Sequence, residues 1–526
     1  MTDKPLDSAG PAGEAAAPDA SRHGLSRALA WLAALTLARI LYLTVHPFDL
    51  HPDEAQYWVW AQDLAFGYYS KPPMVAWLIA ATTAVCGNGE ACVRLSAPLI
   101  HFATALAVYG IGHRLFDARV GFWSALIYAT LPGVSFSAVV LSTDAPLLFF
   151  WALGLYALVT ALQFNSWRRW LLLGMAIGLG LLSKYAMVFF VASAVIYLVV
   201  MRRSVNATLH GFGLRVSAAA LLAALIYLPN LLWNARNQFV SYAHTEDNVN
   251  LSGDLFRIDH LLEFIAAQFG VFGPILFALV LIVLLRWRGW LKEPRALLLV
   301  CFVLPTLALM IGQSFLSRAN ANWAAPVYVA GSVLVTAWVL GRFGAWRVAP
   351  TGGSSSDWRG RLLLLSGSLA LHLAAITMLC VFLVATYGRP DALPAKADPF
   401  KRVRGWTELG ASIALARAEY GALPLLVDER KLMAAVLYYG RPWSAGAVKW
   451  RPGRIHDHFD LTRPLTAASA APRMMLVTER TDAGEITGRF ARADVLAEIR
   501  IPIGIDRERV VRLYELEGFL GYGGGR

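Results

Sequence analysis

The sequence is poor in charge and in cysteine, and both shortages narrow the class of protein. Only 16% of its 526 residues are charged, 57% are hydrophobic and 18 are Trp, whereas roughly a quarter of the residues of a soluble protein are charged. Its 4 cysteines are too few for a disulfide framework and too scattered for a metal site. The composition therefore indicates a membrane protein.

No cleavable signal peptide is evident in the sequence either. Residues 1–24 are rich in Ala, Pro, Gly and Ser and have no basic start, so we predict a disordered cytoplasmic tail followed by a retained helix. The net charge of +12 does not indicate nucleic acid, because the arginines cluster in short loops between apolar runs. That pattern is typical of membrane orientation.

Long apolar runs dominate residues 25–387 and approach the roughly 20 residues that a bilayer requires. We predict about eleven transmembrane helices near 25–47, 93–115, 119–139, 143–163, 168–183, 185–201, 214–233, 261–285, 295–313, 323–341 and 362–387. The apolar run 74–85 is too short to span and is expected to be re-entrant or interfacial. The basic loops place the N-terminus in the cytoplasm and the first loop, 48–92, outside.

Residues 388–526 are charged and mixed in pattern, which predicts a small α/β domain on the outer, periplasmic face. We expect helices at 405–420 and 430–439, and strands at 423–427, 473–478 and 509–515. The fold class is thus a polytopic α-helical membrane protein with a small C-terminal α/β domain.

The first outer loop carries the strongest site candidates. HPDEAQYWVWAQDLAFGYYSKPP, residues 51–73, places Asp53 and Glu54 just after a predicted span and Lys71 further on. Its aromatic residues, Tyr69 among them, fit an interfacial belt. A carboxylate that accepts a proton and a lysine that holds a phosphate are the groups needed to act on a lipid-borne anion.

Other polar residues fall at the outer ends of spans. Asp144 begins a span and is either a functional residue or part of a helix cap. Lys184 lies between two spans and either binds an anion or reaches to the headgroups. His244 is either a ligand or a solvated residue.

Two further pairs of residues also have two possible interpretations each. Arg318 and Asn322 either contact substrate or, in the case of Asn322, only cap a helix. Cys86 and Cys92 share the outer loop, where they are either disulfide-bonded or two buried thiols.

Taken together, these motifs resemble the GT-C glycosyltransferases. The resemblance rests on HPDEAQYW with GYYSKPP, Thr143-Asp144, Lys184, and Asn322-Trp323 with Pro326, and it covers roughly residues 25–345. The sequence is similar to the branch containing protein O-mannosyltransferases and the aminoarabinose transferase of lipid A. It looks closest to the transferases that move galacturonic acid from polyprenyl phosphate to lipopolysaccharide core or lipid A.

The resemblance implies an inverting glycosyltransferase in the bacterial inner membrane, acting on its periplasmic face. Asp53 matches the catalytic base, with Glu54 beside it, and Lys71 and Lys184 match positions that hold the donor phosphate. Asp144, Tyr69, His244, Arg318 and Asn322 are candidate substrate contacts. The partners implied are a polyprenyl-phosphate sugar donor, an envelope acceptor such as lipid A or lipopolysaccharide core, and membrane lipids.

Ser70 stands where the aminoarabinose branch has an acidic residue, so we predict no metal and no cofactor, although the carboxylate-rich loop leaves room for a divalent metal. Alternatives within the fold are a protein O-mannosyltransferase or an aminoarabinose transferase. A lipid-linked sugar transporter or flippase is the alternative of another class. The binding sites of transporters have charged residues near the bilayer midplane, whereas the candidate residues here lie at the ends of spans. A structural assembly subunit would give no reason for Asp53, Lys71 and Lys184 to share a face.

Overall fold

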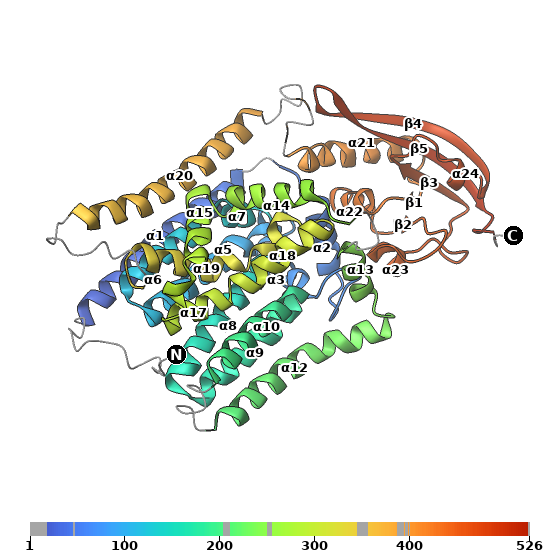
Figure 1. The fold of residues 1–526 in the computed structure, drawn as a ribbon. Coiled ribbons are helices and arrows are strands. Elements are labelled where there is room, and N and C mark those ends of the chain that lie inside the picture. Colours follow the sequence, from blue (N-terminus) through green and yellow to red (C-terminus); the bar gives the residue numbers. More distant parts are fainter. Residues whose placement is uncertain are drawn as a thin grey trace. The chain divides into compact units, whose positions relative to one another are not determined.

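The chain divides into two compact units of contacting residues, and Figure 1 labels helices and strands of both. The computed structural model describes residues 18–45, 48–202, 211–249, 255–343, 356–386, 394, 398 and 400–523. Unit 1 consists of Met1–Thr44, Lys71–Val75 and Arg94–Leu379, and unit 2 of Val45–Ser70, Ala76–Val93 and Cys380–Arg526. The predicted tail up to residue 17 and the predicted boundary at 387–388 lie outside the described residues.

Unit 1 is helical, as the apolar runs predict. Six helical stretches of the described chain are long and apolar enough to cross a membrane. They belong to α1 (Pro18–Val45), α4 (Glu90–Arg94) continued by α5 (Ser96–Leu115), α8 (Asp144–Phe164), α12 (Phe212–Arg236), α17 (Pro294–Cys301) continued by α18 (Leu304–Leu316), and α20 (Ser356–Thr386). The protein is therefore a membrane protein with several spanning helices.

The predicted span 261–285 is broken. Helices α14 (Ile258–Val271) and α15 (Pro274–Leu285) meet at 115°, so they form a bent span or a re-entrant pair. Gly273 takes φ +89°, which L side chains rarely adopt, and Pro274 has no N–H to continue the hydrogen-bond ladder. These two residues explain a break that hydropathy alone does not show.

The remaining helices of unit 1 are shorter. They are α6 (Ala118–Thr130), α7 (Pro132–Ser137), α9 (Trp167–Ser183), η1 (Tyr185–Met187), α10 (Val188–Val200), α13 (Val240–Val249), α16 (Trp287–Trp290), η2 (Ala321–Ala324) and α19 (Val327–Val339). Glycines allow close packing of α9 on α12: a Cβ on Gly174 would lie 2.3 Å from the carbonyl oxygen of Ala219. Small residues at such crossings are typical of membrane helices.

Unit 2 is an α/β assembly, as predicted for the C-terminal segment. Its sheet has the order β2-β1-β3-β5-β4, with β1 parallel to both neighbours and β3, β5 and β4 antiparallel. The strands are β1 (Leu425–Val427), β2 (Val448–Lys449), β3 (Arg473–Thr478), β4 (Phe490–Gly504) and β5 (Arg507–Phe519). The helices are α2 (Pro52–Ala61), α3 (Met74–Cys86, whose first two residues group with unit 1), η4 (Lys401–Val403), α21 (Trp406–Glu419), α22 (Arg430–Tyr439), α23 (His458–Thr462) and α24 (Gly484–Thr487).

The predicted division of the chain differs from this grouping. The sequence places the loop 48–92 with the membrane domain, whereas Val45–Ser70 and Ala76–Val93 group with the C-terminal segment in unit 2. The physical reason is that α2 packs against α22. A second difference is β4, which the sequence does not predict.

The aromatic residues of the first loop do not form an exposed belt. Trp60 is 1% exposed and stacks on Tyr68 with ring centroids 4.6 Å apart, and Tyr69 is 8% exposed. His458 of α23 packs edge-on against both Trp60 and Tyr68. The interfacial belt is therefore wrong for these residues, because the C-terminal segment covers them.

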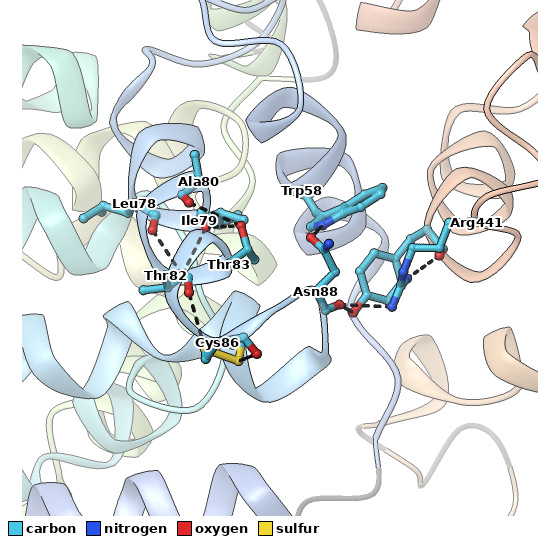
Figure 2. Close-up of a disulfide and its surroundings, with 11 residues drawn as sticks. Trp58, Leu78, Ile79, Ala80, Thr82, Thr83, Cys86, Asn88 and Arg441 are labelled. Carbon is cyan, nitrogen blue, oxygen red and sulfur yellow. Dashed lines mark hydrogen bonds between the residues drawn. A yellow bond between two sulfur atoms is a disulfide. The ribbon is translucent and has the colours of Figure 1, made fainter.

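Cys86 and Cys92 form a disulfide with a Cα–Cα distance of 5.9 Å. It closes the loop that carries Asn88, and Figure 2 shows Asn88 between Trp58 and Arg441. The Asn88 side-chain oxygen accepts from Trp58 Nε1 at 2.8 Å, and its carbonyl oxygen accepts from Tyr438 Oη at 2.7 Å and from Arg441 Nη2 at 3.0 Å. The disulfide thus fixes a loop that joins α2 to the end of α22.

Candidate active site: two polar clusters

Asp53 and Glu54 lie in the first turn of α2, where their surroundings differ. His51 is the N-cap: its Nδ1 accepts from the Asp53 N–H at 3.2 Å, and Glu54 Oε2 accepts from the His51 N–H at 2.9 Å. Pro52 suits the first helical position because it has no N–H to leave unpaired. Glu54 is 1% exposed, so its observed role is to cap the helix.

Asp53 is the accessible carboxylate of the pair. Its side chain is 44% exposed, and Oδ1 accepts from Nη1 of Arg430 at 2.8 Å. The same Nη1 donates to Gln56 Oε1 at 2.8 Å, so Arg430, the first residue of α22, bonds to two residues of α2. Burial lowers the pKa of His51, which agrees with an unprotonated Nδ1 that accepts a hydrogen bond. The ion pair with Arg430 therefore fixes the Asp53 carboxylate at the start of α2.

Unit 1 holds a separate cluster at the N-terminus of α8. Lys184 Nζ donates to Asp144 Oδ1 at 2.6 Å, and Asn322 Nδ2 donates to Asp144 Oδ2 at 2.7 Å. The side chains of Lys184 and Asp144 are 17% and 9% exposed. Both Asp144 oxygens are thus used between helices, which argues against a capping role, and Lys184 is paired rather than extended toward headgroups.

Lys71 belongs to the same unit as this cluster. It is half-buried, and it is close enough to Asp144 to act on that carboxylate electrostatically. Pro72 and Pro73 follow it and restrict the backbone on its C-terminal side. The structure therefore brings together Lys71, Asp144, Lys184 and Asn322, four residues that the sequence analysis selects separately.

The remaining predicted contacts are Tyr69, His244 and Arg318. Tyr69 donates to the Ile455 carbonyl at 3.4 Å in unit 2. His244 is half-buried on α13, and Arg318 is exposed with no ion pair to a described residue. No group of three or more His, Cys, Asp or Glu with metal-binding geometry occurs among the described residues. Arg430 is the residue that sequence reasoning missed, because nothing local to it marks Asp53 as its partner.

Comparisons with known proteins agree with this architecture. Residues 70–233, which carry Lys71, Asp144 and Lys184, match the family described as dolichyl-phosphate-mannose-protein mannosyltransferase. The chain is 35% identical over 404 residues to the lipid A galacturonosyltransferase RgtD of Rhizobium johnstonii, covering 77% of this chain and 80% of that protein. It is 29% identical to an undecaprenyl phosphate-aminoarabinose transferase of Pseudomonas aeruginosa, covering 68% and 66%.

Solved structures give the same fold. Apo ArnT from Cupriavidus metallidurans superposes with a TM-score of 0.62 at 16% identity, covering 94% of this chain and 99% of that one. The chain belongs to this family of polytopic GT-C membrane glycosyltransferases. It is accordingly an enzyme that transfers a sugar, and the two polar clusters are the parts of it that suit such chemistry.

Proposed function

We propose that this enzyme transfers a sugar, with galacturonic acid as the leading candidate, from a polyprenyl-phosphate donor to lipid A or lipopolysaccharide core. The observation that carries the proposal is the 35% identity to a lipid A galacturonosyltransferase over 77% of the chain. The aminoarabinose transferases are less similar, at 26–30% identity, and they define the second candidate sugar.

The chemistry assigned to each cluster follows from its groups. An acceptor hydroxyl oxygen attacks the anomeric carbon while Asp53 takes the hydroxyl proton, and the bond from that carbon to the phosphate oxygen breaks. The polyprenyl phosphate leaves with the electron pair, and the anomeric configuration inverts. Lys71 and Lys184 stabilise the charge that grows on the departing phosphate. An acceptor phosphate would need no base, and Asp53 would then only orient it.

A cavity in unit 1 supports the lipid part of the proposal. It has a volume of about 450 Å³ and is lined mainly by apolar side chains, with Asp144 and Asn322 at its wall. An apolar space beside a polar cluster fits a ligand with a hydrocarbon tail and a charged head. The tail would lie in this cavity, and the phosphate would lie at Lys184.

The topology is part of the proposal. We infer eleven spans, a cytoplasmic N-terminus, and unit 2 in the periplasm of a bacterial inner membrane, because basic residues favour cytoplasmic loops. A periplasm-dependent reporter fused after Gly388 should be active, and the same reporter after Arg202 should be silent. The reverse pattern would refute the orientation and the periplasmic site together.

The transfer itself is tested in two ways. Mass spectrometry of lipid A and core from a deletion strain should show the loss of one sugar, restored by the parent gene and not by Asp53→Asn. Purified enzyme should move that sugar from polyprenyl phosphate to the unmodified lipid. An unchanged envelope in the deletion strain would rule out the proposed acceptors.

A further inference from the structure

Unit 2 contains a cavity that the proposed mechanism does not use. Its volume is about 760 Å³, within the range typical of small-molecule sites. Asp53 of α2 and the N-cap residue His51 form part of its wall, and the remainder comes from η4, α21, α22, β4, β5, Glu429 and Glu479. We call it the basic pocket, after the residues Lys401, Arg402, Arg430, Lys431, Arg507 and Arg509 that line it.

The acidic residues of this wall are all engaged. Asp53 bonds to Arg430, Glu429 to the N–H groups of Lys431 and Leu432, Glu479 to Arg509, and Glu508 to Arg500. By contrast, four basic wall residues form no ion pair with any described residue: Lys401, Arg402, Lys431 and Arg507. The pocket therefore presents uncompensated positive charge.

Two guanidinium groups at the wall have hydrogen-bonding capacity to spare. Arg430 uses only Nη1 toward the described residues, at Asp53 and Gln56, although a guanidinium has five N–H donors. Arg509 packs 3.4 Å from the centroid of Trp406 and donates from Nη1 to Glu479, and its buried Nε has no partner among the described residues. Unpaired donors beside unpaired charges are what an anionic ligand requires.

We propose that the basic pocket binds an anionic group of the lipid acceptor, a phosphate or carboxylate on its saccharide headgroup. The proposal rests on the function proposed above and adds the means by which the acceptor is recognised. Arg430 bonds to Asp53 and also lines the pocket, so an anion held there would place its sugar beside the Asp53 carboxylate. An acceptor without an anionic group would not be held in the pocket, so its sugar would not be placed beside Asp53.

Binding of two lipids to the full-length enzyme in phosphatidylcholine nanodiscs tests the proposal. The probes are radiolabelled lipid A with its phosphates and the same lipid after phosphatase treatment. The parent should bind the phosphorylated lipid about tenfold more tightly, since charge-assisted hydrogen bonds are individually worth about that factor. In Lys431→Gln/Arg507→Gln the ratio of the two Kd values should fall to about one.

The matched control is Arg454→Gln. Arg454 is an exposed arginine of unit 2 that does not line the pocket and forms no ion pair with a described residue, so this variant should keep the parent's ratio. A double variant with the parent's ratio, or a parent without preference, overturns the proposal. Inorganic phosphate or phosphatidylglycerol that competes as well as phosphorylated lipid A overturns it too, because the pocket would then not recognise the acceptor.

Sugar transfer measured on the same samples separates the two hypotheses. A parent that prefers phosphorylated lipid A but transfers nothing to it refutes the proposed function and supports the pocket. A parent that transfers sugar without preferring the phosphorylated lipid refutes the pocket alone.

Discussion

Variants of Lys184 distinguish two roles of its side chain, stabilising Asp144 through an ion pair and holding the donor phosphate. In Lys184→Met the Asp144 carboxylate, 9% exposed, loses the ammonium group 2.6 Å from its Oδ1. Breaking a buried pair by removing one partner costs about 3–5 kcal/mol, because a charge is left uncompensated. Asn322 still donates to Oδ2 at 2.7 Å, so we expect the lower end of this range, about 3 kcal/mol.

The second variant removes the uncompensated charge. In Asp144→Asn/Lys184→Met neither charge remains, so most of the lost stability should return. Each kcal/mol shifts Tm by roughly 2 °C in a large domain, so the single variant should melt about 6 °C below the parent and the double variant close to it. Loss of monodisperse protein after heating in detergent measures this shift, at one fixed heating time because such unfolding is irreversible.

Transfer activity gives the decisive comparison. If Lys184 holds the donor phosphate, both variants should remain inactive although the double variant is stable. A double variant that recovers transfer together with its stability would show that Lys184 only neutralises Asp144. A single variant as stable as the parent would refute the buried ion pair itself.

Three further predictions concern the other residues of the site. Asp53→Asn should lower transfer by about a hundredfold or more and leave donor binding intact, since general-base catalysis is worth about that much; parental turnover would exclude Asp53 as the base. Lys71→Met should abolish transfer and Lys71→Arg should lose most of it, because a planar guanidinium does not replace a compact ammonium. Near-normal turnover of Lys71→Arg would show that Lys71 contacts only lipid headgroups and does not hold the donor phosphate. Cys86→Ser/Cys92→Ser should lower the midpoint of thermal inactivation and increase proteolysis near Asn88, because the disulfide closes that loop; a cleavage pattern like the parent's would show that the loop holds without it.

Local signals predicted much of the fold. Apolar runs indicated the helices of unit 1, and the helix at 430–439 and the strand at 473–478 coincide with α22 and β3. Strand β4 was missed because its Ala, Leu, Glu and Arg residues are good helix formers. Most of its side chains are exposed, and it is a strand because it pairs along its length with β5. Apolar residues alternate with others only at its end, where Arg500 and Pro502 separate Ile499, Ile501 and Ile503, so the pattern does not show the length of the strand.

The sequence predicted site residues only where a charged residue lies at the end of a membrane span. Asp144 and Lys184 stand out because charges at span ends are rare, and the structure pairs them. Arg430 had no such signal, because arginine is ordinary in a charged domain. Glu54 shows the converse, since its position beside Asp53 suggested chemistry and the structure uses it as a cap.

The Asp53–Arg430 ion pair also determines when the start of α2 can reach its final structure during protein synthesis. The two residues are 377 positions apart in the chain, and ribosomes add roughly 5–20 residues per second. Asp53 is therefore added to the growing chain about 20–75 s before Arg430. Until then its carboxylate has no arginine to hold it, so the acidic turn acquires its final geometry only when synthesis of the protein is almost complete.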